Sequence, residues 1–142
     1  MAPRVVLDTN VVVAALRSRR GASAAVLLGA GTGQFEFCIS VALFFEYESV
    51  LKRPEAGVVL PVAAIDDILD HLAAVGRREQ IFFLWRPVLP DPADDHVLEV
   101  AVAGRCDTIV TYNRRDFRGV GQFGLRIVSP SEFLLELRRE EP

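Results

Sequence analysis

Carboxylates that directly follow apolar runs are the side chains of this sequence best suited to chemistry. Asp8 follows the run RVVL in "PRVVLDTNVVVAAL", where a short buried strand would end and a helix would begin. A carboxylate in that position is partly desolvated, which raises its pKa unless donors or a positive charge stabilise the ionised form. Capping of the following helix by Asp8 or Asn10 is one explanation. Binding of a cation is the other.

A second acid lies on the apolar side of a predicted helix over residues 94–103. The apolar residues spaced +3, +4, +7 and +8 from Asp94 share its face, and they are Val97, Leu98, Ala101 and Val102. Asp95 lies about 100° away, at the edge of this stripe. The stretch "DPADD" is equally typical of a capped helix start, with Asp91 as the cap.

Other acids are less clearly placed by spacing. Glu46 and Glu48 flank the apolar stripe of a predicted helix over residues 41–53 on opposite sides, so periodicity does not choose between them. Asn113 and Asp116 belong to a short loop, "YNRRDF", whose composition also suits a turn.

The elements that position these residues alternate along the chain. Short, mostly apolar strands are predicted at 4–7, 35–40, 80–84, 107–111 and 126–129. Helices are predicted at 11–18, 23–31, 41–53, 62–75, 94–103 and 131–139. This alternation predicts a doubly wound α/β fold in three layers, α/β/α, with a central, mostly parallel five-stranded sheet.

Ligands of such sheets bind beyond the carboxyl ends of the strands, near the point where strand order reverses. Acids from separate segments would meet there, and their mutual repulsion must be offset by a cation or by protons. The sequence holds one lysine, Lys52, so lysine side chains cannot supply this charge. Oxygen ligands without His or Cys suit a hard ion, and we expect Mg²⁺ or Mn²⁺.

Composition sets further bounds. The 142 residues fit a single domain, 1–142, and 51% of them are hydrophobic, as in a folded globular chain. No apolar run reaches the roughly 20 residues of a membrane span, and no signal peptide pattern is present, so we expect a cytoplasmic protein. Cys38 and Cys106 are predicted to be reduced packing residues. His71 and His96 lack a partner at ligand spacing, which argues against zinc.

The net charge of −3 argues against a uniformly basic nucleic-acid-binding surface. It leaves room for local patches, because 15 of the 16 basic residues are Arg and many are clustered. Arg pairs well with phosphate groups, although arginines at helix ends are also simply solvated. The clusters are Arg17, Arg19 and Arg20, then Arg77 and Arg78, then Arg114, Arg115 and Arg118.

Three blocks of the chain together resemble a known family. The blocks "VVLDTNVVVAAL", "ISVALFFEYESVLKRP" and "LPDPADDHVLEVAVAGRCDTIVTYNRRDF" are similar to those of PIN domains, and the nearest kin look like bacterial toxins of the VapC kind. The resemblance implies a Rossmann-like sheet and a metal-dependent ribonuclease. It also implies a toxin of a type II toxin-antitoxin pair, with a small antitoxin as partner and a homodimer or higher oligomer as assembly.

The resemblance also assigns residues. It maps the first three family acids onto Asp8, Glu46 and Asp94, which makes Glu46 the choice over Glu48. Asn113 stands where the family pattern has a fourth aspartate, and Asp116 is expected to take over that role. All five side chains are thus expected metal ligands, and the four acids are expected to be catalytic.

Further residues are expected to hold RNA. Asn10, Ser40 and Thr111 lie at predicted strand ends, where they can bind phosphate or cap a helix. Arg114 and Arg115 are expected to contact the RNA backbone.

Two alternative functions stay open. One is a non-catalytic module of the same fold that binds RNA or protein. The other is an aspartyl phosphatase of the HAD type, although Asn10 stands where that chemistry needs a second acid.

Overall fold

The computed structural model describes residues 2–81, 95–118 and 120–140. The strands in these ranges are β1 (Arg4–Leu7), β2 (Glu36–Ile39), β3 (Arg77–Arg78), β4 (Thr108–Val110) and β5 (Arg126–Val128). The α-helices are α1 (Thr9–Arg17), α2 (Ala22–Leu28), α3 (Val41–Leu51), α4 (Val62–Val75), α5 (Asp95–Ala103) and α6 (Pro130–Glu140). Short 3₁₀ helices are η1 (Pro54–Ala56), η3 (Arg114–Phe117) and η4 (Val120–Phe123).

The strands form one five-stranded sheet in the order β3-β2-β1-β4-β5, and every neighbouring pair is parallel. The chain builds one half of the sheet outward from β1 and then returns to build the other half from β4. Leu7 at the end of β1 lies opposite Val110 at the end of β4. The reversal of strand order therefore brings the residues that follow these two strands together, as in other doubly wound sheets.

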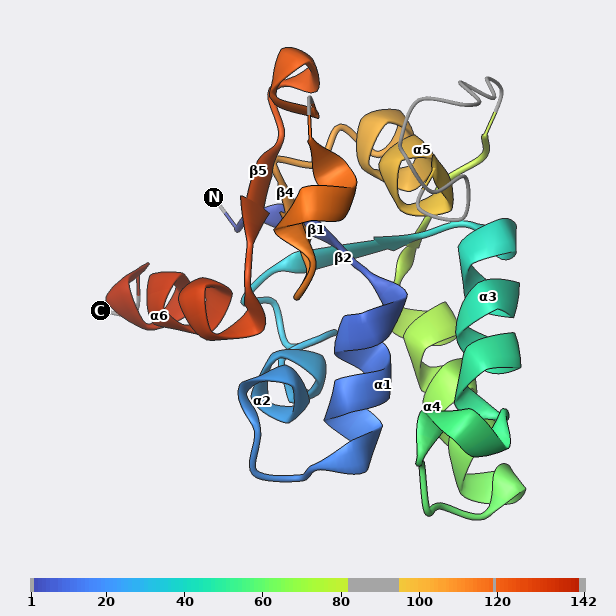
Figure 1. Ribbon diagram of the computed structural model, residues 1–142. Coiled ribbons are helices and arrows are strands. Elements are labelled where there is room, and N and C mark those ends of the chain that lie inside the picture. The colour runs from blue at the N-terminus through green and yellow to red at the C-terminus, as the bar shows by residue number, and fades with distance from the viewer. Residues whose placement is uncertain (1, 82–94, 119, 141–142) are drawn as a thin grey trace.

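Helices cover both faces of this sheet (Figure 1). One face carries α5, η3 and η4, and the other carries α1, α2, α4 and α6, with α3 at the side of the sheet. Parallel strands covered on both faces need apolar residues in succession, and Val5, Val6 and Leu7 are all fully buried. Phe35 and Phe133 pack edge to face, with their ring centroids 5.3 Å apart, which joins α6 to the segment before β2.

The predicted fold class is confirmed, and most element bounds agree within three residues. The third strand is the exception, because it was predicted at 80–84 and lies at Arg77–Arg78. Helix α4 ends at Val75 and the chain leaves it through the extended Gly76, so residue 77 is already beside β2. Both β3 residues are exposed, as an edge strand allows, and apolar periodicity therefore could not reveal this strand. Residues 82–84 of that prediction lie outside the described residues.

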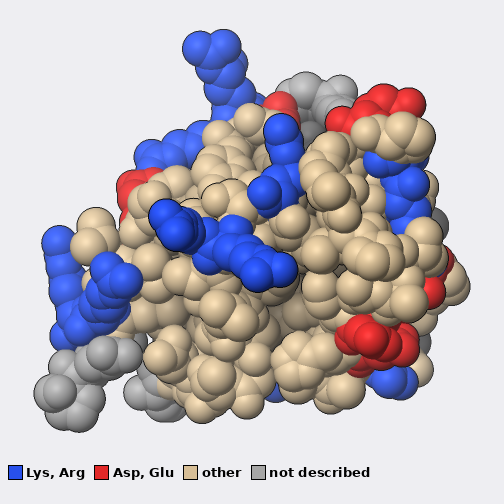
Figure 2. All heavy atoms as spheres, turned by 90° about the horizontal axis from the view of Figure 1, so that it is seen from below, with Lys and Arg blue, Asp and Glu red and all other residues tan. Residues whose placement is uncertain are grey.

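The surface is not evenly charged. Lys and Arg predominate over Asp and Glu on the face that Figure 2 shows, which is the underside of the molecule in Figure 1. An overall charge of −3 thus coexists with a face on which cations predominate. Within the described part of the chain, none of the helices has the length and apolar character needed to span a membrane.

Candidate active site

Asp8 lies at the reversal point of the sheet, between β1 and α1. Its side chain caps α1 by accepting a hydrogen bond from the backbone N–H of Thr9, at 2.8 Å. The Thr111 hydroxyl donates a second bond to Asp8 Oδ2, at 2.7 Å. Asp8 is only 5% exposed. Capping and a buried functional carboxylate are therefore not exclusive alternatives for this residue.

The charge of Asp8 is disfavoured where it lies. Burial raises the pKa of Asp8 from 3.8 to about 6, while the hydrogen bonds from Thr111 and Thr9 oppose that rise. The negative charges of Glu46 and Asp116 add to it, so both side chains lie within electrostatic range of Asp8. Three of the predicted acids, contributed by β1–α1, α3 and η3, thus face one region.

Thr111 joins the two strand ends. Its side chain is completely buried, and besides donating to Asp8 it accepts the backbone N–H of Asn113 at 3.0 Å. Asn10 reaches the same segment from α1, with its Oδ1 accepting the backbone N–H of Tyr112 at 3.3 Å. These bonds fix the loop after β4 against the first turn of α1. Thr111 and Asn10 therefore hold the loop after β4 in place beside Asp8.

Glu46 and Glu48, which spacing could not separate, have different surroundings. The Thr9 hydroxyl donates a hydrogen bond to Glu46, which places the Glu46 carboxylate beside the first turn of α1. Glu48 instead pairs with Lys52, at 3.1 Å, and Lys52 also pairs with Asp66. Glu46 therefore lies on the side of α3 that faces Asp8, and Glu48 lies in a surface ion-pair cluster.

His96 is a residue that reasoning from the sequence missed as part of this region. Its Nδ1 lies 3.5 Å from Glu46 Oε1, too far for a hydrogen bond, and is a buried polar atom without a hydrogen-bond partner among the described residues. In the sequence, His96 is a single histidine after a run of acids without a second His at ligand spacing, so no local pattern marks it. Asp94, expected as the third family acid, lies outside the described residues.

Asn113 and Asp116, the two candidates for the fourth acidic position, lie in the loop after β4 and differ in burial. Asp116 lies in η3, and its backbone N–H donates to the Asn113 carbonyl at 3.1 Å. Asp116 is half-buried and raises the pKa of Asp8, whereas Asn113 is exposed. Of the two, Asp116 is the one whose negative charge acts on Asp8.

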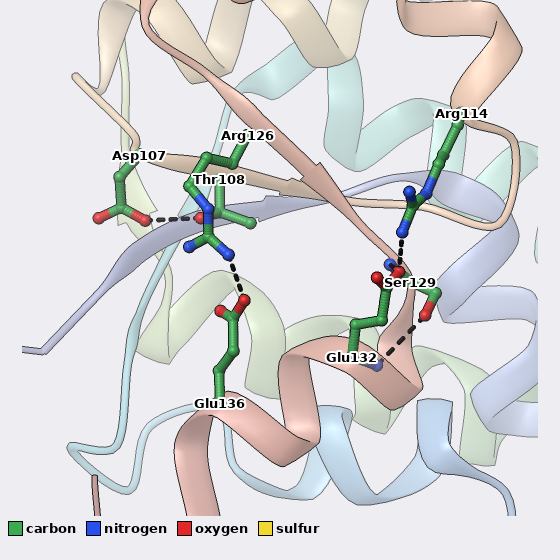
Figure 3. Close-up of polar contacts among 7 residues, drawn as sticks. All are labelled: Asp107, Thr108, Arg114, Arg126, Ser129, Glu132 and Glu136. Atoms are coloured by element: carbon green, nitrogen blue, oxygen red, sulfur yellow. Dashed lines mark hydrogen bonds and ion pairs between the residues drawn. The ribbon is translucent and has the colours of Figure 1, made fainter. Parts of the chain in front are cut away.

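The residues expected to hold RNA occupy three different environments. Ser40 is buried and caps α3 by accepting the Leu43 N–H at 3.1 Å. Arg114 pairs with Glu132 at the start of α6 (Figure 3). Arg115 is exposed. The structure thus uses Ser40 as a helix cap and ties Arg114 to α6, while the Arg115 side chain lies at the surface.

The partner of Arg114 is itself fixed by a capping box. The Ser129 N–H donates to Glu132 Oε1 at 2.9 Å, and the Glu132 N–H donates to the Ser129 hydroxyl at 3.2 Å (Figure 3). The ion pair with Arg114, followed by the bonds from Ser129, lowers the pKa of Glu132 to about 2. Glu132 is therefore ionised at neutral pH and holds Arg114 there.

The donor set fits a hard divalent cation. No three His, Cys, Asp or Glu side chains among the described residues form a preassembled metal cage. Asp8 is nevertheless a buried carboxylate, and both its burial and the negative charges of Glu46 and Asp116 disfavour its ionised form. A bound cation would stabilise that ionised form by its positive charge. His96 Nδ1, 3.5 Å from Glu46 Oε1, is a second buried polar atom in this region, and it has no hydrogen-bond partner among the described residues.

Comparison with known proteins defines the class. Residues 4–115, most of the chain, match the family model of the PIN domain, so the chain belongs to the PIN domain family. Its structure is similar to a chain in the crystal structure of VapBC2 from Rickettsia felis bound to a DNA fragment from their promoter. The TM-score is 0.60 at 16% identity, over 89% of this chain and 98% of that one, which is a likeness of fold. No curated protein matches the sequence.

Proposed function

We propose that this protein is a metal-dependent endoribonuclease and the toxin of a type II toxin-antitoxin pair. The observation that carries the proposal is the buried Asp8 at the strand reversal of a PIN-family chain, with its charge opposed by Glu46 and Asp116. A buried carboxyl whose pKa is raised in this way is typical of a functional site. Asp8, Glu46, Asp94 and Asp116 would be the acids of the site, with Asn113 as a neutral oxygen donor.

A bound Mg²⁺ or Mn²⁺ would make water a stronger nucleophile and offset charge on the scissile phosphate. Side chains of this protein hold the acids that would bind the ion. Thr111 and Thr9 hold the Asp8 carboxylate from two sides, and the Thr9 hydroxyl holds Glu46. The other Glu46 oxygen, Oε1, which lies 3.5 Å from His96 Nδ1, would accept a proton from the attacking water. Attack by water would leave a 5′-phosphate and a 3′-hydroxyl.

Substrate binding follows from the exposed polar groups around these acids. Arg115 would contact a phosphate directly, and Arg114 would do so after leaving Glu132. Asn10, Thr111 and Ser40 would act mainly by holding the strand ends in place, with hydrogen bonds to RNA as a secondary role.

The partner and the setting are part of the same proposal. The structurally similar VapBC2 complex pairs two components and was solved on promoter DNA. By analogy, this chain would pair with a small antitoxin and form a homodimer or a higher oligomer, acting on RNA in the cytoplasm. A gene for a small protein beside this one, whose product copurifies with the chain, would support the pairing.

The activity is tested with the protein purified free of any partner, on RNA with Mn²⁺. Asp8→Asn and Asp94→Asn should each lower the cleavage rate by about 10²-fold or more, as expected when a preorganised group that stabilises the transition state is lost. Glu46→Gln and Glu48→Gln form a matched pair on one helix, and only the first should lose activity. Equal cleavage by all of these variants contradicts the assignment.

One observation favours a second candidate. Asn113 replaces the fourth family acid, and such a departure fits a non-catalytic module that keeps the fold to bind RNA or protein. That module would bind RNA with no cleavage in Mn²⁺ or Mg²⁺, and its unfolding temperature would not change when Mn²⁺ is added. A Mn²⁺-dependent rise that Asp8→Asn abolishes favours the nuclease.

A further inference from the structure

Tyr112 presents an anchored aromatic ring at the surface next to the acids. The residue is 50% exposed although it lies only two positions after the fully buried strand β4. Its hydroxyl shares a hydrogen bond with the hydroxyl of Ser23, which is buried in α2, and its backbone N–H donates to Asn10 Oδ1. Hydrogen bonds thus hold the residue at its hydroxyl and at its backbone, while half of the residue's surface is accessible to solvent.

Tyr112 is one of the residues that line a hollow of about 610 Å³, together with Thr111, residues 113–116 and Ser129. This hollow adjoins the candidate active site, because two of its lining residues, Thr111 and Asp116, also belong to that site. Thr111 donates the hydrogen bond to Asp8, and Asp116 is one of the two acids that raise the pKa of Asp8. A group bound in the hollow therefore lies immediately beside the acids.

The cations at this hollow differ in availability. Arg114 is paired with Glu132, whose carboxylate also accepts the Ser129 N–H. Arg115 is exposed, and no ion pair or hydrogen bond of its guanidinium is found within the part of the chain that the structure describes. The hollow thus combines a fixed aromatic ring with an available guanidinium, the two groups that bind a base and its phosphate in single-stranded nucleic acid.

We propose that this hollow binds one unpaired RNA base, which stacks on Tyr112 while the adjoining phosphate contacts Arg115. The inference rests on the proposed ribonuclease function and adds to it a subsite for one base, with Tyr112 and Arg115 as its residues. A base inside a duplex is stacked between its neighbours and cannot offer a face to Tyr112, whereas a base in a single strand can. Because the Tyr112 hydroxyl is already hydrogen-bonded to Ser23, binding of a base requires less loss of side-chain entropy at Tyr112.

Binding of a fluorescent single-stranded RNA hexamer, measured by anisotropy in EDTA so that no cleavage occurs, tests this subsite. Tyr112→Ala should weaken binding about tenfold, the usual size of a base–aromatic stack. Tyr112→Phe keeps the ring and loses the hydroxyl, and it should bind within about twofold of the wild type. Leu135→Ala, a residue of matched exposure (52%) on α6, should leave binding unchanged.

A scan with abasic nucleotides separates stacking from a structural role of Tyr112. Removing the base at one position of the hexamer should weaken binding to the wild-type protein about tenfold and have no further effect on Tyr112→Ala. Wild-type binding that is insensitive to abasic substitution at every position overturns the proposal, and so do equal losses in Tyr112→Phe and Tyr112→Ala. The scan on wild-type protein decides the matter even if Tyr112→Ala fails to fold.

Cleavage in Mn²⁺, measured in parallel, separates this inference from the proposed function. A protein that cleaves RNA but shows no single base-dependent position refutes the subsite alone. A protein that shows the base-dependent position but does not cleave refutes the nuclease and retains the subsite. Absence of any single-stranded RNA binding by the wild type, or tighter binding of a duplex of the same sequence, also refutes the subsite.

Discussion

Asp8→Asn should stabilise the protein in the absence of divalent metal. Burial raises the pKa of Asp8 from 3.8 to about 6, so the folded protein binds a proton more tightly than the unfolded chain does. The free energy of unfolding therefore falls as pH rises from about 4 to about 6, and the full loss is present above that range. The rise in pKa corresponds to about 3 kcal/mol, which is an upper bound for the gain from an uncharged side chain.

Asparagine can keep most of the local hydrogen bonds. Its carbonyl oxygen can accept the Thr9 N–H, and its amide can donate to the Thr111 hydroxyl if that hydroxyl turns. We expect a net gain of about 1–3 kcal/mol at pH 7.5, which for a chain of this length is roughly 2–4 °C in unfolding midpoint per kcal/mol. At pH 4 the gain should vanish, because the wild-type Asp8 is then largely protonated when folded.

Metal should offset most or all of the stability advantage of Asp8→Asn. At a Mn²⁺ concentration of about 100 times its dissociation constant, the wild type gains about 2.7 kcal/mol, and Asp8→Asn gains little. Thermal unfolding in EDTA and in Mn²⁺, at pH 4 and 7.5, gives all four comparisons. Asp66→Asn is the control for metal binding, since this acid pairs with Lys52 away from the site and its removal should leave the response to Mn²⁺ unchanged. Asp8→Asn that is less stable than the wild type in EDTA at pH 7.5 refutes the reasoning.

Two further predictions concern bonds that support the site. Tyr47→Phe should lower the free energy of unfolding by about 1–3 kcal/mol, since it leaves the buried Leu7 carbonyl without the donated O–H bond, and denaturant unfolding measures this. No change would mean that this bond is absent in solution. Glu132→Gln retains an acceptor for Ser129 but loses the charge that pairs with Arg114. Because the pKa of Glu132 is lowered from 4.5 to about 2, its contribution is full above about pH 4.5 and is lost as pH falls towards 2. The difference in unfolding midpoint between wild type and Glu132→Gln should therefore shrink over that range, and a difference that is constant with pH contradicts the ion pair.

The sequence by itself determined the architecture and the position of Asp8 at the end of the first strand. Apolar runs and helical periodicity are local properties, so they predicted the α/β order and four of the strands. Asp8 was identifiable because a charged residue directly after a buried run needs a physical reason. Resemblance to the PIN domain selected Glu46, which the structure places beside Thr9 and near Asp8.

The tertiary structure decided which side chains meet. The edge strand β3 consists of exposed residues, so no apolar pattern marked it, and pairing with β2 alone defines it. Arg114 carries the same charge and sequence context as Arg115, yet Glu132, 18 residues further along the chain, holds only Arg114. Thr111 and Tyr112 acquired their partners because the ends of β1 and β4 are neighbours in the sheet. Local sequence sets the conformation of each element, but contacts between distant segments depend on strand order and packing, which exist only in the folded chain.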